Sequence, residues 1–95
     1  MTKYDKKKME KRAEKFKALG HPTRLWIVEQ LKDGAEHCVC EFVKAVGVEF
    51  ATVSRHLSVL KTAGIIVDDK RGKEVWYRLA CPCIVSMIDC LEARG

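Results

Sequence analysis

The sequence predicts a small, mainly α-helical fold that carries one β-hairpin. Apolar residues recur at helical spacing in five segments, which indicates five helices. Two further runs, "IIVDD" and "EVWYRL", are rich in the β-branched and aromatic residues that favour strands. Lys70, Arg71, Gly72 and Lys73 join these runs, and a glycine there suits a tight turn. The fold class is therefore helical with a hairpin placed before the last helix.

The first two helices are expected on either side of Gly20. The first spans residues 5–19, and the second runs from Pro22, which suits a first helical turn, to about residue 33. Their apolar stripes are Met9, Ala13 and Phe16, followed by Leu25, Val28 and Leu31. We expect His21 to serve the turn between the two helices.

The third helix is short and opens with cysteines. Val39, Phe42, Val43 and Val46 fall at i, i+3, i+4 and i+7, which predicts one buried face. This frame places Cys38 at the N-cap and Cys40 at the second helical position. Glu41 then stands three residues after the cap, as in a capping box, and Gly47 ends the helix.

The fourth helix is expected from Glu49 to Thr62, with Val53, Leu57 and Leu60 facing the core. His56 flanks this stripe, so we expect a buried, hydrogen-bonded histidine there. The last helix is expected from Pro82 to about Ala93. Two consecutive helices, a short turn and a following hairpin form a winged helix-turn-helix, here as a single domain over residues 1–95.

The composition indicates which partners the chain can bind and in which compartment it is expected. Its formal net charge is +5, which fits an acidic partner such as nucleic acid. No apolar run is long enough for a membrane span, and no apolar stretch follows the basic N-terminus as in a secretory signal. We therefore expect a cytoplasmic protein without membrane contact. Its five cysteines should then be free thiols, metal ligands or redox switches.

The fourth helix and the hairpin are the predicted DNA-binding elements, because the second helix of a helix-turn-helix enters the major groove. Its outward residues are small or hydrogen-bonding: Ala51, Thr52, Ser54, Arg55 and Ser58. Arg55 is suited to a guanine edge or a phosphate. Lys70, Arg71 and Lys73 are expected at phosphates. Lys61 is better interpreted as part of a solvated face.

The runs "LGHPTRLWIVEQL", "CVCEF", "TVSRHLSVLKTAGII" and "RGKEVWYRL" resemble the ArsR/SmtB family of metal-sensing bacterial repressors. The resemblance implies a winged-helix homodimer built from the first and last helices, which binds DNA without metal and releases it with metal. A Cys-x-Cys pair opening the third helix resembles the arsenite- and cadmium-responsive members. The sequence departs from the arsenite pattern at Val43, where many members carry a third cysteine.

The cysteines predict a site for a thiophilic ion. Cys38 and Cys40 lie at a helix N-terminus, where the dipole favours thiolates. Arsenite or antimonite, which prefer three thiolates, are the first candidates for the inducer, ahead of cadmium, lead or zinc. No permanent cofactor is expected. Cys81 or Cys83, within or across subunits, would complete the site. A separate C-terminal site is the second choice, and Cys90 and His37 are weaker candidates.

Two other functions compete with ion sensing. In the first, Cys38 or Cys40 forms a disulfide or polysulfide link with a C-terminal cysteine, and the repressor responds to thiol chemistry. In the second, the chain is a dithiol oxidoreductase. The Cys-x-Cys spacing, without a preceding strand–helix–strand frame, argues against an enzyme.

Overall fold

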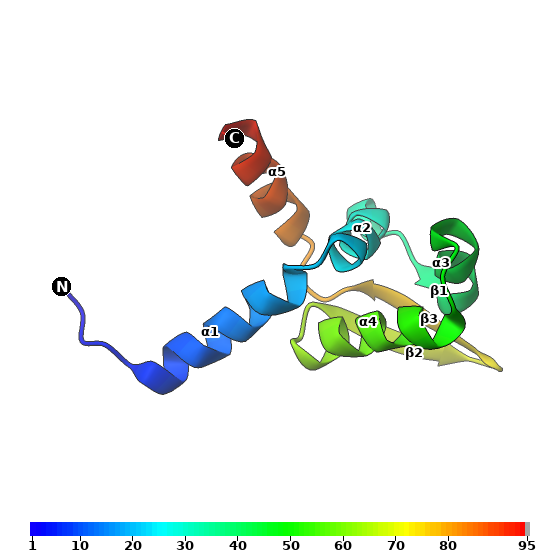
Figure 1. Cartoon of the computed structure of the whole chain (residues 1–95), viewed down its shortest axis with the longest axis horizontal. Coiled ribbons are helices and arrows are strands. Elements are labelled where there is room, and N and C mark those ends of the chain that lie inside the picture. Colours follow the sequence, from blue (N-terminus) through cyan, green and yellow to red (C-terminus); the bar gives the residue numbers. More distant parts are fainter. Residues whose placement is uncertain (95) are drawn as a thin grey trace.

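The computed structural model describes residues 1–94, which form five α-helices, one 3₁₀ turn and a three-stranded antiparallel sheet (Figure 1). The winged helix-turn-helix prediction is confirmed. In chain order the elements are α1 (Lys6–Leu19), α2 (Pro22–Gln30), η1 (Lys32–Gly34), β1 (His37–Cys38), α3 (Val39–Val46), α4 (Phe50–Thr62), β2 (Ile66–Arg71), β3 (Glu74–Leu79) and α5 (Ile84–Arg94). None of the described helices is long and apolar enough to cross a membrane.

Local capping explains where the helices begin and end. The Asp5 side chain accepts the backbone N–H of Lys8 at 3.1 Å and starts α1. His21 starts α2 in the same way, because its Nδ1 accepts the N–H of Thr23 at 3.1 Å. Gly47 ends α3 with a left-handed φ of 75°, a conformation that glycine adopts without steric cost.

The sheet contains a strand that the sequence did not reveal. Its order is β1-β3-β2, so β3 is the central strand and β1 adds a third strand to the expected hairpin. Cys38 lies opposite Trp76 in this pairing. At the hairpin, Arg71 pairs with Glu74, and only Gly72 and Lys73 form the turn. Lys70 and Arg71 therefore belong to the strand and not to the predicted four-residue tip.

The core lies where α2, α3 and α4 meet the base of the sheet. Val28 and Leu31 of the expected stripe are fully buried, as are Val53, Leu57 and Leu60 of α4. Leu25 differs from the prediction, since it is 39% exposed. Ile27 is fully buried and takes its place in the core, because the buried face of α2 is rotated from the predicted stripe.

The first and last helices each contact this core at one end, through Ala18 and Leu19 of α1 and Ile84 of α5, and project away from it along the rest of their length (Figure 1). Phe16 of α1 and Leu91 of α5 remain 59% and 66% exposed. The predicted start of α5 is wrong by two residues: Pro82 and Cys83 form a turn, and the helix begins at Ile84. The first helical hydrogen bond explains the difference, because the N–H of Met87 donates to the carbonyl of Cys83 at 3.2 Å.

Candidate functional site

One face of α4 is open to solvent and carries short polar side chains. Val53 and Leu57 anchor the opposite face in the core. Of the predicted DNA-binding residues, the structure leaves Ala51, Arg55 and Ser58 exposed, while Thr52 and Ser54 are half-buried. Such a surface lets a helix approach the edges of bases closely and offers Arg55 as a forked donor.

The wing consists of β2, β3 and the turn between them. Its basic residues differ in whether they are already paired with carboxylates of the protein. Lys70 and Lys73 are exposed. Arg71 donates to Asp69 at 2.9 Å and also pairs with Glu36, and its guanidinium lies 5.4 Å from the centre of the Trp76 ring. Hydrogen bonds to these two carboxylates raise the pKa of Arg71 above its ordinary value. Arg71 must therefore exchange existing partners to reach a phosphate.

Lys61 is likewise engaged within the protein. Its Nζ lies 2.7 Å from Oδ2 of Asp68, which joins the last turn of α4 to the wing. The hydrogen bond raises the pKa of Lys61 and lowers the pKa of Asp68. The pair holds the wing against the helix instead of presenting a free cation.

A histidine–arginine cluster supports α4 from behind. The rings of His21 and His56 lie 4.4 Å apart between centroids, and Arg24 Nη1 lies 3.2 Å from His56 Nδ1. His56 is hydrogen-bonded as expected, but it is half-buried where a buried histidine was expected. Desolvation, followed by the nearby His21, Arg24 and Arg55, lowers the pKa of His56 from its ordinary value of 6.5.

Cys38 and Cys40 come together at the start of α3. Cys38 is the N-cap and has an extended backbone, with φ −89° and ψ 164°. Its side chain therefore does not have to point in the direction that a helical backbone would impose. Residues two apart within a regular helix would point to different sides. The structure joins the two sulfurs as a disulfide, with the Cα atoms 5.4 Å apart. Cys38 is 3% exposed, whereas Cys40 faces solvent.

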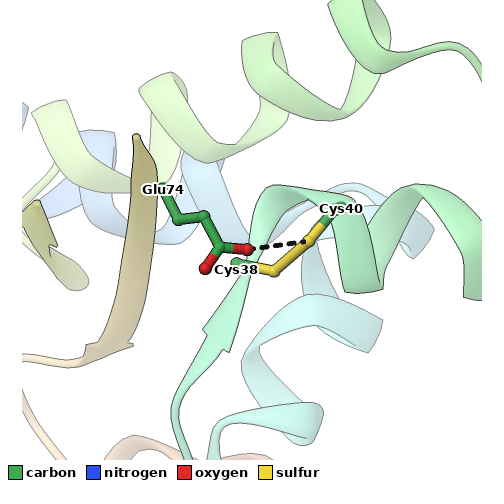
Figure 2. Close-up of side chains that lie close together, drawn as sticks. All are labelled: Cys38, Cys40 and Glu74. Atoms are coloured by element: carbon green, nitrogen blue, oxygen red, sulfur yellow. Dashed lines mark hydrogen bonds between the residues drawn. A yellow bond between two sulfur atoms is a disulfide. The ribbon is translucent and has the colours of Figure 1, made fainter. Parts of the chain in front are cut away.

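A carboxylate from the wing faces this pair. The Sγ atoms of Cys38 and Cys40 and a carboxylate oxygen of Glu74 lie within 4.8 Å of one another (Figure 2). Oε2 of Glu74 lies 3.8 Å from Sγ of Cys40. A disulfide sulfur has no proton to donate, so this contact becomes a hydrogen bond only when the pair is reduced. Two sulfurs and one carboxylate oxygen suit a thiophilic divalent cation.

Glu74 was absent from the residues predicted from the sequence. The signal that would have found it is the pairing of β1 with β3. An antiparallel register that sets Cys38 opposite Trp76 brings the chain two residues later towards the residue two positions before Trp76, which is Glu74.

Glu41 fixes the position of the first turn of α3. Its Oε1 accepts the backbone N–H of Cys38 at 3.1 Å, and its Oε2 lies 3.2 Å from Nδ1 of His37. These two hydrogen bonds lower the pKa of Glu41, with the backbone bond as the larger cause. The His37 side chain therefore contacts Glu41, and it does not belong to the group of potential ligands formed by Cys38, Cys40 and Glu74.

The C-terminal cysteines form a second, separate pair. Sγ of Cys81 and Sγ of Cys83 lie 2.9 Å apart, and both side chains are exposed. The neighbouring Cys81 raises the pKa of Cys83. The pair borders a cavity of about 290 Å³ that is otherwise lined mainly by apolar residues of α1 and α5. Cys90 is exposed on α5.

Within one protomer the two cysteine pairs do not meet. Cys38 lies opposite Trp76, whereas Cys81 follows the far end of β3 at Leu79. Positions 76 and 81 are five residues apart, in a stretch that leaves the strand at Leu79, which corresponds to at most about 16 Å. In the described residues, the one group of three or more potential ligands is Cys38, Cys40 and Glu74.

Comparisons with known proteins agree with this architecture. The profile described as "Bacterial regulatory protein, arsR family" matches residues 21–67. An uncharacterized HTH-type transcriptional regulator, MJ1325 of Methanocaldococcus jannaschii, is 43% identical over 70 residues, which are 74% of this chain and 79% of that protein. The chain belongs to the arsR family. This is a family of transcriptional regulators.

Other arsR relatives are longer than the shared region. The repressor SmtB of Mycobacterium tuberculosis is 45% identical over 70% of this chain and 49% of its own length. The arsenical resistance operon repressor of Escherichia coli is 43% identical over 68% of this chain and 56% of its own length. The chain thus spans about half the length of these two curated relatives.

Solved structures extend the likeness to nearly the whole chain. The structure titled "Reduced HlyU from Vibrio cholerae N16961" has a TM-score of 0.78 and 27% identity and covers 93% of this chain and 92% of HlyU. A homodimeric winged helix-turn-helix domain of Mb0332 from Mycobacterium bovis has a TM-score of 0.81 and 24% identity over 98% of this chain and 88% of its own. The second likeness shows the fold alone.

Proposed function

We propose that this arsR-family chain is a DNA-binding transcriptional repressor that releases its operator when a thiophilic ion binds Cys38 and Cys40. The helix α4 enters the major groove, where Thr52, Ser54 and Arg55 read base edges with Ala51 and Ser58 beside them. Lys70 and Lys73 of the wing contact phosphates, and Arg71 joins them after exchanging its carboxylate partners. The names of the repressor relatives support this assignment.

A single observation carries the sensing half of the proposal. The two sulfurs meet at the first turn of α3, and α3 packs directly on α4. An ion held there requires both thiolates on one side, so it fixes the geometry of that turn. A shift of α3 is passed to the helix that grips DNA through Phe42 and Leu57, which belong to one core cluster.

The exposed apolar surfaces of α1 and α5 support a homodimer. Phe16 and Leu91 would be covered by a second copy, since large exposed apolar residues mark contact surfaces. Dimerisation also presents two α4 helices to two half-sites of one operator.

The inducer belongs to the class of thiophilic ions, with arsenite or antimonite and cadmium, lead or zinc as the alternatives. The arsenical resistance operon repressor among the relatives supports the first group. The chain lacks a cysteine one turn after the pair, where Val43 stands. A third sulfur from Cys81 or Cys83 would have to come from the partner protomer, given their distance from Cys38 in one chain.

The proposal is tested by DNA binding with the reduced protein at fixed salt. Anisotropy of a labelled operator duplex is followed with and without arsenite, cadmium and zinc. The proposal predicts release by at least one ion, and it predicts that Cys38→Ser and Cys40→Ser bind DNA but no longer respond. Cys90→Ser is the matched control and should respond like the parent protein. DNA binding that no ion changes would contradict the sensing function.

A thiol-redox switch is the second candidate, and the Cys38–Cys40 disulfide favours it. Here a peroxide would accept two electrons and two protons from the dithiol and become water or alcohol plus water. The pairing differs from the expected link to a C-terminal cysteine. Loss of DNA binding after peroxide treatment, reversed by a phosphine reductant and absent in Cys40→Ser, would favour this function over ion sensing.

A further inference from the structure

We propose that Glu74 is the third ligand of the ion site, so that the ion joins the sensing helix to the wing within one protomer. This inference rests on the proposed function and deepens it. The ion would then be bound by two sulfurs and one carboxylate oxygen, whereas the sequence analysis predicted mainly cysteine ligands. This donor set also removes the need for a cysteine from the partner protomer.

The surroundings of Glu74 distinguish it from the other wing carboxylates. Asp68 is paired with Lys61, and Asp69 is paired with Arg71. Across residues 1–94, the Glu74 carboxylate makes its one polar side-chain contact with Sγ of Cys40 at 3.8 Å. A carboxylate that faces a sulfur and lacks a cationic partner is available to a cation arriving at that sulfur.

The geometry lets all three donors reach one ion. Their ligand atoms lie within 4.8 Å of one another, and they come from β1, α3 and β3 (Figure 2). Coordination bonds of about 2.3 Å to sulfur and about 2.0–2.2 Å to a carboxylate oxygen place two ligands of one zinc ion at most about 4.6 Å apart. In the structure the two sulfurs are bonded to each other, so the disulfide must be reduced and the sulfurs must separate before an ion binds. Small side-chain shifts then bring the Glu74 carboxylate within this limit. Because Cys40 and Glu74 are exposed, water can fill a fourth position.

The donor set selects the class of ion. Zinc and cadmium accept mixed sulfur and oxygen ligands, whereas arsenite prefers three thiolates. Binding a divalent ion to the reduced site replaces the protons of the Cys38 and Cys40 thiols. The proposed inducer class therefore narrows to zinc-like divalent cations. Oxidation of the pair to the disulfide removes both thiolates and disables the site.

The consequence for DNA binding follows from the position of Glu74. It is the first residue of β3 and adjoins the two-residue turn of the wing. An ion held by Glu74 and Cys40 fixes the tip of the wing against the first turn of α3. The wing and α4 then lose the freedom to adjust together to the groove, which weakens the contact with DNA.

The test is a cadmium titration of the reduced protein, followed by the thiolate-to-cadmium charge-transfer absorbance. Glu74→Gln is expected to lower cadmium affinity about tenfold or more, as removal of a ligand or of its support does at metal sites. Asp69→Asn is the control, because it removes the same charge from the wing without touching the sulfurs. Glu74→Cys should raise the affinity for arsenite at least tenfold by completing a set of three thiolates.

The outcomes separate this inference from the proposed function. Unchanged cadmium affinity in Glu74→Gln, with binding still lost in Cys38→Ser, would overturn the role of Glu74 and leave ion sensing intact. A larger loss in Cys81→Ser or Cys83→Ser than in Glu74→Gln would assign the third donor to the C-terminal pair. Zinc X-ray absorption gives an independent reading, since two sulfurs with oxygen support the inference and three sulfurs contradict it.

Discussion

The guanidinium of Arg71 donates to the carboxylate of Asp69 at 2.9 Å, so the arginine of the wing is already paired in the free protein. A phosphate must replace this carboxylate, and Glu36 as well, before it gains the full attraction of the charge. Lys70 and Lys73 have no such competition among the ion pairs of the described residues.

This difference predicts unequal contributions to the salt dependence of DNA binding. Lys73→Ala should reduce the slope of log affinity against log salt by about 1, the effect of one lost phosphate contact. Arg71→Ala should reduce it by less, because ending its pairing with Asp69 offsets part of the loss. The measurement is DNA affinity at four or more salt concentrations. Equal slopes for the two variants would show that the ion pair does not restrain Arg71.

Arg55 should carry base recognition. Its side chain is exposed on α4, where Val53 and Leu57 fix the helix from behind. Arg55→Ala is expected to cost about 1–3 kcal/mol of operator affinity and to relax the base preference at one position. Competition with operator variants measures both effects. A uniform loss on all sequences, with a lower salt slope, would instead assign Arg55 to a phosphate.

The link between α3 and α4 depends on Phe42. The side chain is 2% exposed and packs edge-on against Trp26, with ring centroids 5.9 Å apart. Phe42→Ala should lower the free energy of unfolding by about 3–5 kcal/mol, the usual cost of truncating a buried aromatic residue. Urea unfolding at fixed protein concentration measures it. Val48, which is 38% exposed, gives the control Val48→Ala with an expected change within about 0.5 kcal/mol.

The helices of the DNA-binding region were predictable from the sequence, whereas the strand β1 was not. The ends of α3 followed from Glu41 and Gly47, because capping is decided within a few residues. The inner stripe of α4 followed from its periodicity. The strand β1 did not, since two residues carry no periodic signal and their partner, Trp76, is remote in the chain. Glu74 was missed for that reason.

The start of α5 was misjudged because a proline favours a first helical turn without requiring one. Pro82 and Cys83 form a turn, and the helix begins after them at Ile84. Likewise, helical spacing in α2 did not settle which side of the helix faces the core. The positions of α4 and the sheet decided that Ile27 is buried and Leu25 is not.

The cluster of His21, Arg24 and His56 predicts acid sensitivity of the fold. The pKa of His56 is lowered in the folded state, so the unfolded chain binds more protons just below pH 6.5. Stability is therefore full above the ordinary pKa of 6.5 and is lost as the pH falls through the lower folded value. His56→Gln keeps an acceptor for Arg24 and should flatten this loss. Urea unfolding from pH 8 to pH 5 tests it, and an unchanged pH profile would contradict the assignment.

Dimer formation is expected to fail when charge is placed on the exposed apolar faces of α1 and α5. Leu91 is 66% exposed in the single chain and would be covered in the dimer. Leu91→Glu should shift the protein towards monomer in sedimentation velocity and weaken operator binding, while the α4 surface stays intact. Glu92→Ala on the same helix is the control. A Leu91→Glu variant that sediments like the parent protein would place the interface elsewhere.

The most direct test of the sensing mechanism is the cadmium affinity of the reduced protein measured free and bound to its operator. Coupling between two sites is reciprocal, so DNA must weaken cadmium binding by the factor with which cadmium weakens DNA binding, typically about 5–150-fold. We predict a lower cadmium affinity on DNA by that same factor, and a DNA affinity of Cys38→Ser that cadmium does not change. Equal cadmium affinity with and without DNA would contradict the mechanism.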